Sequence, residues 1–207
     1  MAVCLLAGFG LWTAAVRMMD VQPIGPGGSV VGFAALNSFV HQLTGVHMLL
    51  YSMTDWLSLV PVGFAMGFAL LGLGQWIRRR QILEVDHSIL VLGAFYLVVM
   101  ALYVFFEVVV INRRPVLIDG ILEASYPSST TLLVLCIMPT AAMQLYQRIK
   151  KGAFRQGIML AMAVYTVLMI VGRLVSGVHW FTDIVGGVLL STGLVMLYRA
   201  ICSLIEE

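Results

Sequence analysis

The sequence predicts an all-α, polytopic membrane protein, a six-transmembrane-helix bundle that forms a single domain over residues 1–207. The first observation behind this prediction is composition, because hydrophobic residues fill 61% of the 207 positions and charged residues only 11%, with a mean hydropathy of +1.00. A soluble domain carries roughly 25% charged residues. The second observation is that no Gly/Ser linker or repeat divides the chain. One small water-soluble core cannot bury this apolar excess, so the bilayer must take much of it.

The spans follow from length, because crossing a bilayer takes about 20 mostly apolar residues. The N-terminal run, about 2–17, is shorter and lacks the basic start and small-residue cleavage site of a signal peptide. We interpret it as a first span with little flank, in keeping with a shortened start site. Five further segments have the required length and apolar character: about 56–77, 88–111, 130–147, 156–175 and 181–201.

The placement of Lys and Arg predicts the orientation of these spans. Eight of the twelve Lys and Arg residues fall in the even-numbered connections or beside the C-terminus: Arg78, Arg79, Arg80, Arg148, Lys150, Lys151, Arg155 and Arg199. The positive-inside rule then places both termini in the cytoplasm of a multi-pass cell-membrane protein, with the connections after spans one, three and five outward. The net charge of +2 is too small to suggest a nucleic-acid partner.

Two further patterns concern the outward connection and the cysteines. The segment about 29–50 follows a Gly- and Pro-rich turn and repeats apolar residues at helical spacing. This pattern predicts an amphipathic helix that lies in the membrane interface and covers the cluster of polar residues described below. The alternative is a short helix packed on the outer loops. Cys4, Cys136 and Cys202 are widely spaced within apolar runs, so they predict neither a disulfide framework nor a metal site.

Polar groups from separate stretches gather at the outward ends of the predicted spans. The strongest pattern holds Arg173, His179 and Asp183. His179 and Asp183 are four residues apart, so they share one helix face, and a carboxylate on one imidazole nitrogen leaves the other free as a nucleophile. An arginine beside such a histidine suits a phosphoryl group. The alternative is that each is an interfacial residue snorkelling to water.

Two more pieces supply anion-binding groups. Pro115 disfavours a helical Arg114, so the third span should end near Arg114 and hold it at the membrane surface. The stretch Tyr126 to Thr131 opens the fourth span with a proline and hydroxyl residues, and free backbone N–H groups at a helix start bind anions. The alternative interpretation of this stretch is simple N-capping.

These three pieces, in this order on six spans, resemble the type 2 phosphatidic acid phosphatase family of membrane lipid phosphatases. The family pattern is Lys-x6-Arg-Pro, then Pro-Ser-Gly-His, then Ser-Arg-x5-His-x3-Asp. The first motif is matched at Arg114-Pro115 and the second at Pro127-Ser128. The third is matched with correct spacing at Arg173, His179 and Asp183, with Gly172 in place of its leading serine.

The resemblance implies roles for these residues. His179 would attack phosphorus and form a phosphohistidine, and Asp183 would orient it. Arg114, Arg173, Ser128 and N–H groups near Ser129 would hold the phosphate oxygens at an outward-facing site. No metal and no cofactor are expected, because the arginines would supply the charge stabilisation.

The sequence also departs from the family at two catalytic positions. Glu107 stands where the family has its lysine, and a carboxylate there would repel phosphate unless it is protonated or paired. Ser129 and Thr130 stand where Gly-His is expected, and a threonine hydroxyl cannot serve as the acid that protonates the leaving alcohol. We hypothesise that His41 or His47, from the outward amphipathic segment, replaces that acid. The alternative is that both are interfacial polar residues.

The predicted function is hydrolysis of a phosphomonoester or diphosphate of a membrane lipid, of the polyprenyl diphosphate (undecaprenyl diphosphate) or phosphatidate class. Because a phosphate monoester leaves more readily than a lipid alkoxide, loss of the acid favours diphosphate substrates. The alternative is a catalytically impaired relative that binds or moves phosphorylated lipids. Asp119 and Glu123, in the outward loop before Pro127, are expected to be solvated or to shape headgroup preference.

Overall fold

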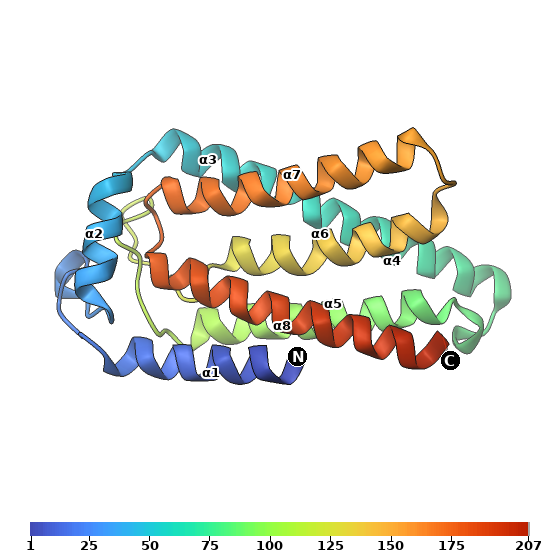
Figure 1. Cartoon of the computed structure of the whole chain (residues 1–207), viewed down its shortest axis with the longest axis horizontal. Coiled ribbons are helices and arrows are strands. Elements are labelled where there is room, and N and C mark those ends of the chain that lie inside the picture. The colour runs from blue at the N-terminus through green and yellow to red at the C-terminus, as the bar shows by residue number, and fades with distance from the viewer. Residues whose placement is uncertain (207) are drawn as a thin grey trace.

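The computed structural model describes residues 1–206, and nearly all of the long segments in it are helical. The long helices run side by side along the longest axis, whereas α2 crosses one end of the bundle (Figure 1). Among residues 1–206, five helical stretches are long and apolar enough to cross a membrane, with a shorter apolar helix, α1, beside them. The predicted all-α membrane bundle is thereby confirmed. The helices are α1 (Ala2–Met18), η1 (Pro26–Gly28), α2 (Ala34–Thr44), α3 (Met48–Leu57), α4 (Leu59–Arg79), η2 (Ile82–Glu84), α5 (His87–Val108), α6 (Ser129–Arg148), α7 (Ala153–Val175) and α8 (Phe181–Glu206).

The second span begins earlier than predicted, because α3 and α4 form one stretch over Met48–Arg79. The sequence pattern assigned the start of this stretch to the outward segment. A break at Ser58 divides it, close to Pro61 in the first turn of α4. Proline has no N–H to donate to the carbonyl of Leu57, and the hydroxyl of Tyr165 donates to that carbonyl instead (2.7 Å). The break therefore leaves this carbonyl satisfied.

The third span ends sooner than predicted. α5 stops at Val108, and the chain continues in extended form through Arg114. The backbone N–H of Arg114 donates to Glu123 O (3.1 Å), and Ser125 N–H donates to Asn112 O (2.9 Å). Residues 112–114 thus pair with the returning segment and do not continue the helix. The connection forms a small hairpin that turns at Asp119 and Gly120, both with positive φ.

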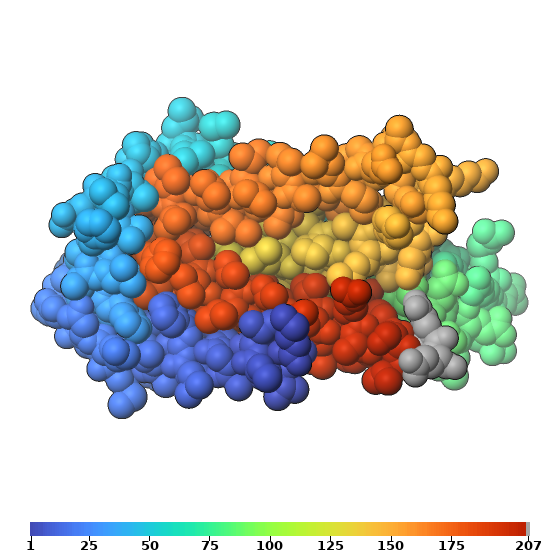
Figure 2. Space-filling model, viewed as in Figure 1, coloured from blue at the N-terminus to red at the C-terminus, as the bar shows by residue number. Residues whose placement is uncertain are grey.

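α6 is the central helix of the bundle. In its most apolar window, 56% of the residues are buried by protein, compared with 11–28% for the other spans. In Figure 2 its surface shows only between those of α7 and α8. Polar side chains on α6 pair inside the bundle: Thr140 donates to Cys136 O (2.7 Å), and Gln144 donates to the hydroxyl of Tyr198 (2.8 Å).

The segment 29–50, which was predicted to face outward, holds two helical parts: α2 ends at Thr44, where Gly45 has φ +68°, and α3 begins at Met48. The inner side of α2 is fixed to the start of α8. Asn37 Nδ2 donates to Thr182 Oγ1 (3.0 Å), and Asn37 Oδ1 accepts from Thr182 N (3.2 Å). Its outer row, Leu36, Phe39 and Leu43, is exposed. The helix is amphipathic and lies across the bundle end (Figure 1), while its contact with a membrane interface stays a prediction.

The two ends of the bundle differ in chemistry. The end of α4 and the α6–α7 connection lie at one end (Figure 1), and seven of the twelve Lys and Arg residues lie in or directly beside them. The starts of α6 and α8 and the end of α7 lie at the other end, where α2 crosses. Arg114, Arg173, His179 and Asp183 therefore gather opposite the basic connections.

Gly177 offers a test of this packing. Its φ is +68°, and an added Cβ would lie 1.8 Å from Gly45 O. The left-handed conformation alone costs an L-residue roughly 1–2 kcal/mol, so we expect Gly177→Ala to lower the unfolding midpoint in detergent by about 2–8 °C. Gly8→Ala is the control, because nothing lies within 4 Å of that Cβ. Equal midpoints for the two variants would show that the connection does not pack as described.

Candidate active site

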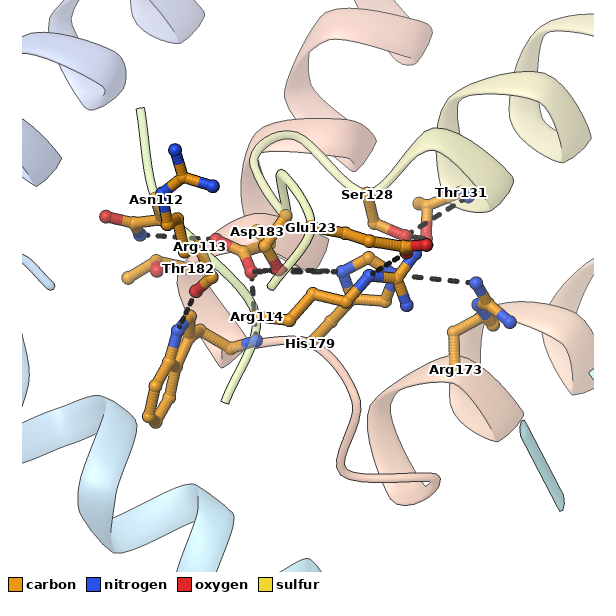
Figure 3. A network of polar contacts seen from close by, with 12 residues as sticks. Asn112, Arg113, Arg114, Glu123, Ser128, Thr131, Arg173, His179, Thr182 and Asp183 are labelled. Atoms are coloured by element: carbon orange, nitrogen blue, oxygen red, sulfur yellow. Dashed lines mark hydrogen bonds and ion pairs between the residues drawn. The ribbon is translucent and has the colours of Figure 1, made fainter. Parts of the chain in front are cut away.

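The strongest sequence pattern forms the turn between α7 and α8. Arg173 lies in the last turn of α7, Gly177 reverses the chain, and His179 precedes the start of α8. Arg173, His179 and Asp183 are all at least 97% buried and lie close together (Figure 3). Arg173 Nη2 is 3.5 Å from His179 Nε2. The turn thus brings the arginine back beside the imidazole.

Ser125 links the imidazole to the carboxylate. The shortest distance between His179 Nδ1 and Asp183 Oδ2 is 3.9 Å, which is too long for a hydrogen bond. The hydroxyl of Ser125 lies 3.0 Å from His179 Nδ1 and donates to Asp183 Oδ2. The carboxylate therefore reaches the imidazole chiefly through a buried hydroxyl group, where the sequence pattern suggested a direct bond.

The neighbours of His179 define its tautomer. The hydroxyl proton of Ser125 is donated to Asp183, so the serine oxygen accepts a hydrogen bond from the Nδ1–H group of His179. Arg173 has only donors, so Nε2 presents a lone pair to it. The imidazole therefore carries its proton on Nδ1 and leaves Nε2 unprotonated.

Asp183 is itself fixed on several sides. Its Oδ2 accepts from the backbone N–H of Trp180 (2.9 Å), and its Oδ1 accepts from Asn112 Nδ2 (3.3 Å). These donors come from two different segments, the turn before α8 and the hairpin after α5. A buried carboxylate with this many donors is held in one orientation.

Burial, followed by the charges of Arg114 and Arg173, holds the pKa of His179 well below its usual range, although contact with Ser125 partly opposes this. Because the pKa is lowered, the imidazole stays neutral at neutral and mildly acidic pH. A neutral imidazole with a free Nε2 can act as a nucleophile.

Arg114 and Arg173 bring two buried guanidinium groups to the same place. Arg114 Nε lies 3.0 Å from Glu123 Oε2 in an ion pair without hydrogen-bond geometry, and Arg173 Nη1 lies 3.6 Å from Asp55 Oδ1. Within residues 1–206, Nη1 of Arg114 and Nε of Arg173 are buried and make no hydrogen bond. Buried donors without acceptors are destabilising, and an anion bound between them would supply the acceptors.

A face of α3 completes the surroundings of the two arginines. The ring centroid of Tyr51 is 5.0 Å from Cζ of Arg173 and 5.8 Å from Cζ of Arg114. Thr54 Oγ1 accepts from Arg173 Nη1 at 3.4 Å. Both guanidinium groups therefore lie over one aromatic ring.

Ser128 occupies the start of α6 and caps it. Its Oγ accepts from the N–H of Thr131 (3.4 Å) and from the Thr131 hydroxyl (3.0 Å), and its own N–H donates to Asp183 O (3.1 Å). The capping alternative thus describes what Ser128 does in this state, and a role on phosphate stays a prediction. Ser129 lies beside Ser128 and lines a small hollow with Glu107 and Ser125.

Glu107 and Thr130, the two residues that differ from the family motifs, lie near the site but supply no acid–base pair. Glu107 is at the end of α5, and no ion pair of its carboxylate is found in the described part of the chain. Thr130 is buried in the first turn of α6. His47 is exposed and its Nε2 lies 2.9 Å from Thr44 O, whereas His41 packs on Trp180 with ring centroids 5.5 Å apart. Neither histidine contacts the imidazole of His179.

Sequence reasoning missed several residues of the site. Ser125 stands just before the recognised Pro127-Ser128 motif, and this nearness was the signal that the sequence offered for it. Tyr51 and Asp55 lie on the segment divided between two predicted elements, so no sequence pattern connected them with the site. Glu123 was expected to be solvated, but it pairs with Arg114.

No curated protein matches the chain. Among solved structures, the chain is similar to the first transmembrane PAP2 type phosphatidylglycerolphosphate phosphatase from Bacillus subtilis, with 20% identity, a TM-score of 0.59, and coverage of 99% of this chain and 96% of that chain. At this identity, the likeness shows a shared fold. Residues 110–203, which carry Arg114, Ser128, Arg173, His179 and Asp183, match the family model of the PAP2 superfamily. This match over residues 110–203 agrees with the family resemblance that the motifs predicted.

Proposed function

We propose that this membrane protein is a lipid phosphatase that hydrolyses a phosphomonoester or diphosphate of a lipid through a phosphohistidine at His179. The observation that carries the proposal is the state of His179. Its Nδ1 is held through Ser125, while its Nε2 faces Arg173 beside buried guanidinium donors that lack partners. A nucleophile next to vacant anion-binding donors is the arrangement that phosphoryl transfer needs.

The proposed reaction has two displacements. Nε2 of His179 attacks phosphorus, the bond from phosphorus to the leaving oxygen breaks, and that oxygen keeps the electron pair. Water then attacks the phosphohistidine, releases inorganic phosphate and returns the imidazole to its starting form. Arg114 and Arg173 stabilise the charge on the phosphoryl oxygens in both steps. Asp183, acting through Ser125, stabilises the positive charge that develops on the imidazole.

The substrate class follows from the leaving group. Thr130 cannot donate a proton near neutral pH. Glu107, the other residue that differs from the family motifs, is not among the side chains that contact His179. A lipid diphosphate expels a phosphate monoester, which leaves with less protonation than a lipid alkoxide does. We therefore expect polyprenyl or other lipid diphosphates to be preferred over phosphatidic acid.

A second candidate function is supported by the same departures. Glu107 and Thr130 replace the two family residues that would assist phosphate binding and leaving-group departure, while the arginines remain buried in the site. A relative with these features could bind or move phosphorylated lipids without hydrolysing them.

The side of the membrane is part of the proposal. The site lies at the bundle end opposite the basic connections after α4 and α6 (Figure 1). The positive-inside rule supports cytoplasmic termini and a site that faces outward.

Trapping of the intermediate separates the two functions. We expect purified protein mixed with a 32P-labelled lipid diphosphate to yield an acid-labile, base-stable phosphoprotein, since phosphohistidine has that stability. His179→Ala should abolish both the label and phosphate release. His87→Ala, at the start of α5 and without a proposed role in the site, is the control and should keep both. Lipid binding without label in the unchanged protein would support the non-hydrolytic function.

Substrate preference is tested by phosphate release from a polyprenyl diphosphate and from phosphatidic acid in the same detergent. We expect kcat/KM for the diphosphate to be at least about tenfold higher, because about 1.4 kcal/mol of leaving-group assistance is no longer required. Equal or faster turnover of phosphatidic acid would contradict the preference.

The low pKa of His179 gives a pH test in the substrate-free protein. Because burial and two arginine charges lower the pKa, the imidazole should stay neutral at pH 6.5, where an ordinary histidine is half protonated. In Arg114→Gln, one of these charges is absent, so the pKa should rise. An NMR titration of the imidazole, with His179→Gln for assignment, measures both values. A midpoint at or above 6.5 in the unchanged protein would contradict the described environment.

A further inference from the structure

The two arginines pose an electrostatic problem in the substrate-free site. Arg173 is 1% exposed and Arg114 is 7% exposed, and both lie against the same ring. Like charges repel, and burial weakens their hydration, so the two groups would separate unless neighbouring residues held them. The residues that hold the two guanidinium groups close together therefore determine whether both arginines can bind one phosphate.

A single face of α3 contacts both guanidinium groups. Tyr51, Thr54 and Asp55 are three and four residues apart, so they project from one side of the helix. Tyr51 is the only one of the three recorded against both arginines within residues 1–206. Its ring lies within the distance at which the negative face of an aromatic ring attracts a cation.

We propose that Tyr51 is a positioning residue that holds Arg114 and Arg173 together on one phosphate. The inference rests on the proposed function, since it names a residue that prepares the same anion site. Tyr51 acts through the two arginines and takes no part in the reaction. Its ring supplies attraction without a full negative charge, so it gathers the cations without competing with phosphate for their hydrogen bonds.

The carboxylates beside the arginines differ from Tyr51 in this respect. The side chains of Asp55 and Glu123 are 56% and 39% exposed, and within residues 1–206 each forms an ion pair with a single arginine. Exposed ion pairs are worth little in water. A carboxylate also occupies donor nitrogens that phosphate needs. The ring is therefore the shared contact that leaves the donors free.

The position of α3 depends on two glycines of the α7–α8 region. An added Cβ at Gly172 would lie 2.8 Å from Thr54 Cγ2, and one at Gly177 would lie 1.8 Å from Gly45 O. The N–H of His47 also donates to Ser176 O (3.0 Å) just before α3 begins. Gly172 stands where the family motif has a serine. This substitution gives α3 the close approach to α7 that brings Tyr51 to Arg173.

The hydroxyl of Tyr51 makes no hydrogen bond within the described residues. The inference therefore attributes its role to the ring. A phenylalanine at this position should serve equally well, whereas a non-aromatic residue of similar size should not.

The test measures binding of vanadate, an analogue of the transferred phosphoryl group, by calorimetry on purified protein in detergent. We expect Tyr51→Leu to weaken vanadate binding at least tenfold and to raise KM for a lipid diphosphate by a similar factor. Tyr51→Phe should stay within about threefold of the unchanged protein. Trp56→Leu is the matched control, because Trp56 is an aromatic residue of the same helix that is 73% exposed, and it should bind vanadate normally.

Circular dichroism and size-exclusion profiles establish that each variant is folded. If Tyr51→Leu does not fold, Tyr51→Met carries the same expectation, since methionine fills the space without a ring. Vanadate binding by Tyr51→Leu or Tyr51→Met within twofold of the unchanged protein would overturn the inference, as would a tenfold loss in Tyr51→Phe.

The outcomes also separate the inference from the proposed function. An unchanged protein that binds vanadate but releases no phosphate from any lipid would defeat the proposed phosphatase and leave the role of Tyr51 standing. One that hydrolyses lipid while Tyr51→Leu binds vanadate normally would do the reverse. Failure of the unchanged protein to bind vanadate would defeat both.

Discussion

Two like-charged guanidinium groups held inside one end of an apolar bundle are the constraint on which the site depends. Arg114 comes from the hairpin after α5 and Arg173 from the last turn of α7, so each element must be fixed for the pair to exist. Their field acts on every neighbour. It favours the neutral form of His179, pairs Arg114 with the carboxylate of Glu123 and gives the ring of Tyr51 a role that packing alone would not require.

The hairpin after α5 joins functions that are separate in the sequence motifs. Arg114 on its outgoing segment reaches the proposed anion site, and Ser125 on its returning segment contacts the imidazole of His179. The backbone bonds between these segments fix the distance between the two side chains. In the proposed mechanism, the binding of the anion and the orientation of His179 therefore both depend on this one hairpin, and a change in its turn would alter both together.

Much of the fold and part of the site could be predicted from the sequence. Apolar length identified the spans, and the spacing of Arg173, His179 and Asp183 identified one corner of the site. Hydropathy could not locate the break at Ser58, since the residues on both sides are apolar, so α3 and Tyr51 were assigned elsewhere. Ser125 was missed because its link between His179 and Asp183 depends on long-range packing, and local spacing carries no record of that.

The burial of α6 has a consequence for how the protein is made. Its most apolar window has a mean hydropathy of 1.4, compared with 2.6 for α5, and it contains Pro139 and Thr140. A translocon partitions each segment by its own affinity for lipid, and α6 has the lowest mean hydropathy of the five candidate spans in the described residues. The neighbouring helices cover the polar groups of α6 and hydrogen-bond to them, as Tyr198 of α8 does with Gln144, whereas lipid cannot. We therefore expect the membrane insertion of α6, whose first residues lie at the site, to depend more than that of the other spans on helices synthesised before and after it.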